Sequence, residues 1–389
     1  MLRALYSGIS GLRSHQTMLD VTGNNIANVN TTAFKGSAVR FQDTLSQMSQ
    51  GAAAPQGGIG GANPAQVGLG VQVAGISTNF VQGSAQSTGR ATDMMINGDG
   101  FFVTSLAGET RYTRAGSFDF DADGRLVTAD GAIVQGWNAV NGEINGMGTI
   151  GNISLPLDAV APAKATDNAA LGGNLPYDAA VGDTIVKDIQ VYDAAGTASM
   201  LELTFTKTAN AGEWDVFEGA TDIGPITFAA DGSLTTTAPL TAGAITVDVA
   251  SLTGYAELST LEFVSQNGRD AGVLEGFSMA KDGTLVGSYS NGTSEALGRV
   301  ALATFANPGG LEKTGGSSYL ATFNSGVAEL GTANTGGFGS LSSGSLEMSN
   351  VDLSQEFTNL IIAQRGFQAN ARIITTSDEI LQELTNLKR

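Results

Sequence analysis

Apolar residues at both ends of the chain recur at alternating spacings of three and four, and this pattern constrains the fold most. The N-terminal seam positions are Leu5, Ile9, Leu12, Leu19 and Ile26. The C-terminal seam positions are Phe357, Leu360, Phe367, Ile374 and Leu381, with Leu384 on a second stripe. A period of 3.5 residues is typical of helices that pair along a seam. We therefore predict terminal helices over residues 1–30 and 350–389 that pair as a coiled-coil base.

The second stripe of the C-terminal helix also contains Ile373 and Ile380, which a pair of helices within one chain would leave in water. A buried Leu, Ile or Phe stabilises by about 1.5–3 kcal/mol. Ordering a residue costs about 1–2 kcal/mol of backbone entropy, so a lone helix pair is only marginally stable. We expect loosely held helices in the monomer and firmly held helices in an assembly.

The sequence between the two ends is rich in glycine and has the pattern of β-structure. No charged residue occurs between Asp43 and Arg90, and we interpret residues 31–66 as a linker or extended arm. Alternating runs separated by Asn-Gly and Asp-Gly pairs predict hairpins. We expect an inner β domain over 67–150 with 273–349, and an outer β insertion domain over 151–272. The predicted fold is therefore multidomain and mainly β, with nested domains of barrel or sandwich type outside the paired helices.

Composition excludes several classes of function. The net charge of −18 argues against nucleic acid and against an anionic membrane surface. The absence of cysteine excludes disulfides, thiolate metal sites and a thiol nucleophile. No segment approaches the ~20 apolar residues of a membrane span. Ser7 and Gly8 interrupt any signal-peptide core, so we expect export, if it occurs, to keep the N-terminus.

Several long segments carry a resemblance to a known family. They include "SGISGLRSHQTMLDVTGNNIANVNTTAFKGS", "MMINGDGFFVT", "RYTRAGSFDFDADGRLVTADGAIVQGW" and the C-terminal "GSLEMSNVDLSQEFTNLIIAQRGFQANARIITTSDEILQELTNLKR". In this order they resemble the rod-and-hook family of bacterial flagellar axial proteins. Ala33 departs from the family pattern, in which glycine is usual, and this puts the local backbone turn in doubt. Distal rod proteins lack a large outer domain, so the insertion at 151–272 makes hook members of the family the nearest match.

The resemblance implies a structural subunit and not an enzyme. Copies would polymerise helically into a flexible tube, a universal joint that transmits torque from rod to filament, with paired helices lining its channel. The implied partners are other copies, the distal rod protein, the hook cap protein, the hook-filament junction proteins and the flagellar type III export apparatus. The implied location is the extracellular hook and basal body, reached without a cleaved signal peptide.

An amide cluster closes the N-terminal helix pattern: Asn24, Asn25, Asn28 and Asn30. Such side chains hydrogen-bond the local backbone where helices end. At the other end, Ser349 or Asp352 is expected to cap the C-terminal helix.

Two features invite a catalytic or metal-binding interpretation, and we reject both. Asp119, Asp121, Asp123, Gly124 and Asp130 have the spacing of a calcium loop, but strand-like flanks favour a hairpin turn. The single histidine, His15, is expected at a solvated or interface position.

We therefore predict no catalytic, cofactor-binding or metal residues and no cofactor. Two alternatives remain: a distal rod protein with an inserted outer domain, and a secreted β-rich carbohydrate-binding or hydrolytic protein.

Overall fold

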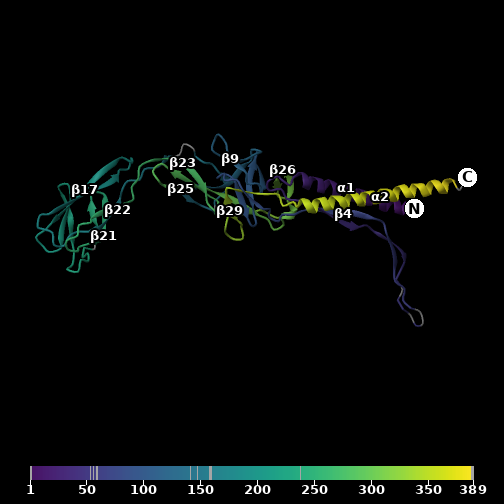
Figure 1. Ribbon diagram of the computed structural model, residues 1–389, viewed down its shortest axis with the longest axis horizontal. Helices are drawn as coiled ribbons and strands as arrows, with labels where there is room; N and C mark the ends of the chain where they lie inside the picture. Colours follow the sequence, from purple (N-terminus) through teal and green to yellow (C-terminus); the bar gives the residue numbers. More distant parts are fainter. Residues whose placement is uncertain are drawn as a thin grey trace. The chain divides into compact units, whose positions relative to one another are not determined.

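The computed structural model describes residues 2–52, 54–55, 57, 60–140, 142–146, 148–156, 160–236 and 238–386. The fold is mainly β, with paired N- and C-terminal helices and several sheets outside them (Figure 1). It divides into two compact units. Unit 1 comprises Met1–Leu155, Ser278–Val286 and Ala296–Arg389, and unit 2 comprises Pro156–Phe277 and Gly287–Glu295. Unit 2 is thus an insertion in the sequence of unit 1, composed of two segments rather than the single expected segment 151–272.

Helices α1 (Leu2–Ala27) and α2 (Leu353–Asn386) lie side by side in unit 1 (Figure 1). Asp352 caps α2, because its Oδ1 accepts hydrogen bonds from the backbone N–H groups of Ser354 (2.8 Å) and Gln355 (3.2 Å). The facing residues of the two helices run in opposite sequence directions, with Gly8 near Asn370 and Asn25 near Glu356. The helices are therefore antiparallel, as expected for elements at opposite ends of one chain.

Residues expected to form a linker instead contain strands. Strand β1 (Ser37–Asp43) pairs antiparallel with β4 (Val71–Thr78), and both contact α1. Beyond them, β2 (Ser46–Gln50) pairs with β3 (Ala65–Gly68), and every residue of these two strands is exposed. The sequence predicts that the inner β domain starts near Val67. In the structure, β4 joins β1 along α1 and forms a separate two-stranded sheet.

The inner sheet of unit 1 has the strand order β25-β11-β7-β8-β27-β26. These strands are β25 (Ser294–Thr304), β11 (Ile133–Val140), β7 (Phe101–Leu106), β8 (Glu109–Thr113), β27 (Ser318–Leu320) and β26 (Glu312–Gly315). Shorter strands pair at its margins: β9 (Phe118–Phe120), β10 (Leu126–Thr128), β12 (Glu143–Ile144), β13 (Gly151–Asn152) and β28 (Glu329–Thr332). A 3-10 turn, η1, spans Pro308–Gly310. Aromatic side chains fill one core beneath this sheet: Phe101, Tyr112, Trp137, Phe305 and Tyr319.

Two small sheets join the inner domain to the segment before α2. Strand β29 (Ser340–Ser343) pairs with β6 (Met94–Asn97), and β30 (Ser345–Glu347) pairs with β5 (Ala85–Ser87). Because β30 lies only a few residues before α2, this pairing fixes where that helix starts.

Unit 2 contains two four-stranded sheets around one core. One has the order β20-β21-β15-β22, from β20 (Leu240–Ala242), β21 (Ile245–Thr253), β15 (Asn168–Asn174) and β22 (Glu262–Gln266). The other has the order β16-β17-β18-β19, from β16 (Thr184–Tyr192), β17 (Ala198–Lys207), β18 (Glu213–Glu218) and β19 (Thr221–Thr227). Trp214 and Phe205 are fully buried between them. In addition, β14 (Val160–Ala161) pairs with β23 (Gly272–Met279), while β23, β24 (Thr284–Tyr289) and β25 each have residues in both units.

Candidate functional site

The paired helices touch through small residues. A methyl group added at Gly8 would lie 3.5 Å from the Asn370 carbonyl oxygen, and one added at Gly11 would lie 2.6 Å from Asn370 Oδ1. At Gly366 the added methyl group would lie 2.4 Å from the His15 ring. The buried positions of this contact share small or polar side chains: Gly8, Gly11, Ser14, Thr22 and Asn25 on α1, and Ala363 and Ser377 on α2. The absence of bulky side chains along this line lets the two backbones approach closely.

This small-residue line is displaced by one residue from the predicted seam. Gly8 and Gly11 precede Ile9 and Leu12, and Gly366 precedes Phe367. One residue turns a helix by about 100°, so Leu12 and Phe367 lie beside the contact line. The seam residue Ile374 reaches this line, because its Cγ1 would lie 3.5 Å from a methyl group added at Gly8. The helices pair as predicted, and the structure adds a line of small residues directly beside the predicted seam. Gly8, which interrupts a signal-peptide core in the sequence, lies on this line together with Gly11 and Gly366.

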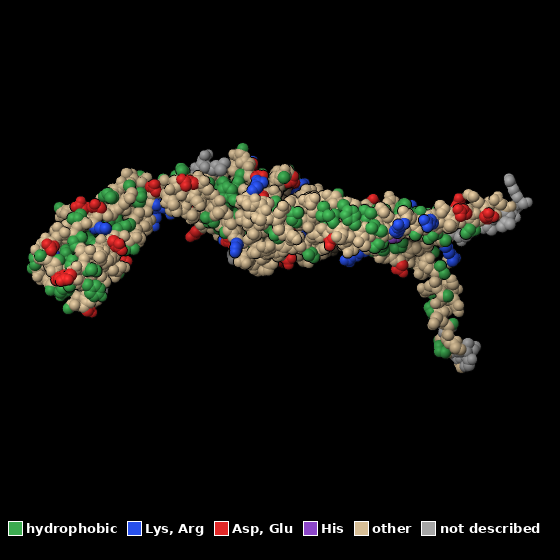
Figure 2. All heavy atoms as spheres, viewed as in Figure 1, with side chains coloured by type: hydrophobic (Ala, Val, Ile, Leu, Met, Phe, Trp, Pro, Cys, Tyr) green, Lys and Arg blue, Asp and Glu red, His purple; other side chains and the backbone are tan. Residues whose placement is uncertain are grey.

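The described seam side chains are all partly or largely exposed in the single chain. Half-buried are Leu5, Leu12, Leu19, Ile26, Leu360 and Ile374. Exposed are Ile9 (39%), Phe357 (51%), Phe367 (38%) and Leu381 (36%). The side chain of Leu384 lies outside the described residues. Figure 2 shows hydrophobic side chains at the surface of this part of unit 1. The pair thus presents apolar area that its own chain does not cover.

A buried ion pair joins the two chain ends where the helices meet the β domain. Lys35 follows α1, Glu347 ends β30, and both side chains are fully buried. Lys35 Nζ donates to Glu347 Oε1 at 2.6 Å and to the Val81 carbonyl oxygen at 2.9 Å. Burial lowers the pKa of the Lys35 ammonium, and the Glu347 carboxylate opposes that shift. Arg114 Nη1 lies 3.6 Å from Glu347 Oε2, so a second buried cation faces the same carboxylate.

Of the four predicted asparagines, Asn25 has the longest reach. Its Oδ1 accepts from the Ser37 N–H at 3.0 Å, and its Nδ2 donates to the Ser37 carbonyl oxygen (2.8 Å) and to Glu356 Oε1 (3.0 Å). It is 1% exposed and joins α1, β1 and α2.

The other asparagines act locally or are exposed. Asn28 Nδ2 donates to the Asn24 carbonyl oxygen at 2.9 Å, which is the predicted helix-end role. Asn30 is exposed.

Sequence reasoning missed Asn350, which belongs to the same junction. Its Oδ1 accepts from the Gly36 N–H at 2.9 Å, and its Nδ2 donates to the carbonyl oxygens of Asn79 (2.8 Å) and Val81 (2.9 Å). Its position between the two candidate caps of α2, Ser349 and Asp352, was the available signal. Together Asn25, Lys35, Glu347 and Asn350 join the chain entering the β domain to the chain leaving it.

The aspartate-rich segment is a hairpin turn between β9 and β10. Asp121 Oδ1 accepts from the N–H groups of Asp123 (3.0 Å) and Arg125 (2.8 Å), while Oδ2 accepts from Arg125 Nε at 2.8 Å. The carboxylate oxygens are thus occupied by the turn itself. Among the described residues, no group of three or more His, Cys, Asp or Glu side chains is placed to hold a metal ion.

His15 lies between elements of unit 1. Its ring packs against Gly366 of α2 and meets the Phe41 ring edge-on at 5.8 Å. It therefore has an interface position, one of the two positions expected for it. Within the part of the chain that the structure describes, no helix is both long enough and apolar enough to cross a membrane.

Comparisons with known proteins match three parts of the chain to families. Residues 5–35 match "Flagella basal body rod protein", residues 95–166 match "Flagellar hook protein FlgE/F/G D1 domain", and residues 342–387 match "Flagellar basal body rod FlgEFG protein C-terminal". The first and third segments include the residues of α1 and α2 that form the small-residue contact, and they include Lys35 and Glu347.

Full-length relatives are similar along the whole chain. The flagellar hook protein FlgE of Borreliella burgdorferi is 41% identical and that of Treponema pallidum 38% identical, each with full coverage of both chains. The flagellar basal-body rod protein FlgG of Bacillus subtilis is 35% identical, again with full coverage of both. A crystal structure of Helicobacter pylori flagellar hook protein FlgE2 aligns with a TM-score of 0.48 at 14% identity, covering 66% of this chain and 98% of that chain.

Proposed function

Because the chain belongs to the family of bacterial flagellar rod and hook proteins, we propose that its copies polymerise helically into the flexible tube of the hook. The protein is a structural component of the flagellum and not an enzyme. In the proposed tube it transmits torque from the rod to the filament as a universal joint. The observation that carries this proposal is the pair of terminal helices, which meet through small residues and leave Ile9, Phe357 and Phe367 exposed.

The exposed seam side chains are the proposed contacts between copies. Charged side chains on this surface would be well solvated by water. Phe357 and Phe367 instead expose apolar area, which is more stable when another protein surface covers it. Burying such a side chain against another copy contributes about 1.5–3 kcal/mol, so several of them per subunit support assembly. The seam residues of α1 and α2 therefore line helix–helix contacts in the tube, with Leu384 among them.

We propose a separate structural role for each segment of the chain. Residues 1–30 with 350–389 form the channel-lining base, and residues 31–66 form an arm along it. The inner sheet of unit 1, with the strands before α2, forms the inner domain, and unit 2 (156–277 with 287–295) forms the outer domain. The lack of charge between Asp43 and Arg90 supports an arm that packs against other protein surfaces.

The proposed partners are other copies, the distal rod protein, the hook cap protein and the hook-filament junction proteins. The proposed route is flagellar type III export without cleavage, to an extracellular position in the hook. Export in an extended form requires helix pairing that is easily undone, and this agrees with a contact in which few large side chains are buried.

Full-length similarity to a rod protein favours a second candidate, a distal rod subunit with an inserted domain. Electron microscopy of cells that lack the protein separates the two. Rods without hooks are expected for the hook subunit, and missing distal rods would favour the second candidate.

Polymerisation itself is tested by truncation. Removing residues 2–28 or 355–389 is expected to abolish tubes while leaving soluble β domains that unfold cooperatively. Tubes formed by either truncated chain would overturn the proposal.

A further inference from the structure

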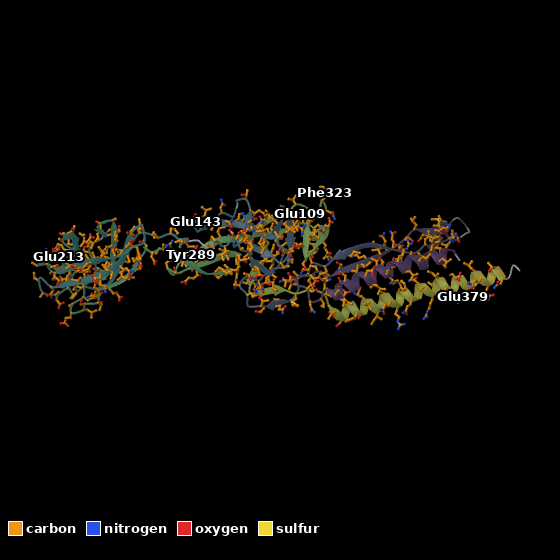
Figure 3. The ribbon with its side chains drawn as sticks, turned by 90° about the horizontal axis from the view of Figure 1, so that it is seen from above. Glu109, Glu143, Glu213, Tyr289, Phe323 and Glu379 are labelled. Carbon is orange, nitrogen blue, oxygen red and sulfur yellow. The ribbon has the colours of Figure 1, made fainter. Side chains whose placement is uncertain are left out.

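The loop between β27 and β28 presents one aromatic side chain to solvent. In this Phe323 loop (residues 321–328), Phe323 is fully exposed and Val327 is 89% exposed. Figure 3 shows Phe323 at the edge of unit 1, on the same side as Glu109. Together Phe323 and Val327 form a small apolar patch at the tip of the loop.

The loop is held rigidly from behind. Ser325 is fully buried, and its Oγ donates to the Thr322 carbonyl oxygen at 2.8 Å while accepting from the Thr322 N–H at 2.9 Å. Thr322 Oγ1 donates to the Gly310 carbonyl oxygen at 2.6 Å, and Asn307 Nδ2 donates to the Asn324 carbonyl oxygen at 2.9 Å. The backbone on both sides of Phe323 is thus fixed before any partner arrives. Such preorganisation lowers the entropy lost on binding, and aromatic anchors dominate protein interfaces.

Unit 1 also contains a cavity of suitable size and chemistry. The Tyr319 cavity has a volume of about 530 Å³, and its lining includes Asn28, Phe34, Ala115, Ala129, Lys313 and Tyr319. Its size falls in the range of pockets that enclose small molecules, so one aromatic side chain and part of its turn fit. Lys313 Nζ lies 5.3 Å from the centre of the Phe34 ring and donates to the Lys35 carbonyl oxygen (3.1 Å) and to Ser37 Oγ (3.0 Å), so the cavity lining already holds a cation against an aromatic ring.

We propose that Phe323 of one copy inserts into the Tyr319 cavity of a neighbouring copy of this chain. This inference rests on the proposed function, because a polymer places copies of the chain against one another. The Phe323 loop and the cavity lining share no residue, so each copy can donate its loop to one neighbour and receive a loop from another. A contact of this unlike kind extends an assembly instead of closing a pair.

Charge does not oppose another copy as the occupant of the cavity. Each chain carries −18, so copies repel one another over most of their surfaces. The Phe323 loop contains no charged residue, and the cavity lining balances Asp130 against Lys313. The two surfaces can therefore meet without bringing like charges together.

The cysteine-free sequence gives a direct test. Phe323→Cys and Ala129→Cys chains are made in the same cells, hooks are isolated, mildly oxidised and separated without reductant. Ala129 is exposed at the cavity, so a cysteine fits there. A band of twice the subunit mass is expected only when both variants are present, because a disulfide requires close sulfur atoms. Val181→Cys, exposed at 70% in unit 2, replaces Phe323→Cys as the matched control and is expected to give no such band.

Two outcomes in assembled hooks overturn the proposal. Isolated hooks that contain both variants but no dimer would exclude the contact, while the hooks themselves would still support the proposed function. A dimer from Phe323→Cys alone would indicate a contact between like loops.

Should Phe323→Cys prevent assembly, a photoreactive benzoylphenylalanine at position 323 keeps the aromatic ring. Its cross-linked peptide is expected to contain residues of the Tyr319 cavity, and a peptide from another surface would contradict the proposal.

Discussion

At the scale of single residues, Lys35 and Glu347 illustrate how one buried contact joins distant parts of the sequence. Glu347 Oε1 also accepts from the Gly83 N–H at 2.8 Å, and Arg114 lies on the carboxylate's other side. Two buried cations therefore depend on a single anion. Removing one partner of a buried ion pair is costly because the remaining charge is left without compensation.

Glu347→Gln is accordingly expected to destabilise the purified monomer by about 3–5 kcal/mol, since it leaves Lys35 and Arg114 facing a neutral amide. Lys35→Met should cost less, because Glu347 keeps Arg114 and the Gly83 N–H. Thermal unfolding measures both. Glu109→Gln, which breaks an ion pair whose carboxylate is half exposed, is the control and should change stability by only about 0.5 kcal/mol. Equal melting temperatures for all three variants would refute the argument.

A second prediction at this scale concerns Tyr319. Burial raises the pKa of Tyr319 to about 12, above the ordinary value of 10.0. As pH rises, the Tyr319 hydroxyl therefore loses its proton in the unfolded chain before it does so in the folded chain. The stability that Tyr319 contributes to the folded state is fully present below pH 10 and is lost as pH rises toward 12. The slope is about 1.4 kcal/mol per pH unit. Burial lowers the pKa of Lys35 and Lys313 below 10.5, and these two groups add stability as pH rises toward 10.5.

Comparison with Tyr319→Phe separates the pH-dependent stability due to Tyr319 from that due to Lys35 and Lys313. Denaturant unfolding at several pH values should show a shallower loss above pH 10 for this variant than for the native chain. Identical slopes would contradict the assignment.

At the scale of elements, the helix pair shows what a hydrophobic period can and cannot predict. The period correctly indicated two long terminal helices that pair. It indicates Leu12 and Phe367 as seam residues because large apolar side chains usually fill such seams. It does not indicate Gly11 and Gly366, where the two helices approach closely. A helix can pack through either of two adjacent rows of side chains, and the choice depends on which surface covers the other row. The sequence of a single chain does not show that second surface.

Two other local features also depend on contacts between residues that are distant in the sequence. Ala33 adopts a left-handed backbone conformation (φ 56°), so the turn that glycine usually makes in this family is present with alanine. The Ala33 N–H donates to the Glu347 carbonyl oxygen at 2.8 Å, a long-range contact that holds the strained residue in place. Likewise β4 was expected in the inner domain, but its partner β1 lies in a segment whose strand pattern is weak.

Two glycines in the helices provide a matched test of the small-residue contact. Alanine is better than glycine in a helix by about 1 kcal/mol. Gly23→Ala should therefore stabilise α1, because nothing lies within 4 Å of the added methyl group. Gly366→Ala should loosen the pair despite its better propensity, because the methyl group meets the His15 ring and such overpacking costs about 1–3 kcal/mol. Hydrogen exchange of α2 amides should be faster in Gly366→Ala and unchanged or slower in Gly23→Ala; the reverse order would exclude the contact.

At the scale of the whole molecule, the apolar surface of the helices separates folding from assembly. Phe357 is 51% exposed in the single chain, so its burial contributes little to the monomer. If neighbouring copies cover Phe357, a charged residue at this position destabilises the polymer but not the monomer. The sequence predicts helices that are loose in the monomer and firm in the assembly, and this difference stays a prediction. It does not predict that Asn25, Lys35, Glu347 and Asn350 join the chain ends in the monomer.

Phe357→Asp is expected to change monomer stability by only about 0.5 kcal/mol, as for other surface substitutions. It should nevertheless prevent tube formation, because an unpaired carboxylate buried between copies costs several kcal/mol, on the order of a lost interface anchor. Monomer melting and electron microscopy of cells give the two measurements. Val186→Asp, 53% exposed on a strand of unit 2, is the control and should leave tubes intact. Normal hooks with Phe357→Asp would contradict the proposed interface.

The chain crosses between the two units four times, at 155/156, 277/278, 286/287 and 295/296. Three of these crossings fall within strands β23, β24 and β25. The two units are therefore joined by four covalent connections along the chain, so cutting any one peptide bond leaves them linked by the other three.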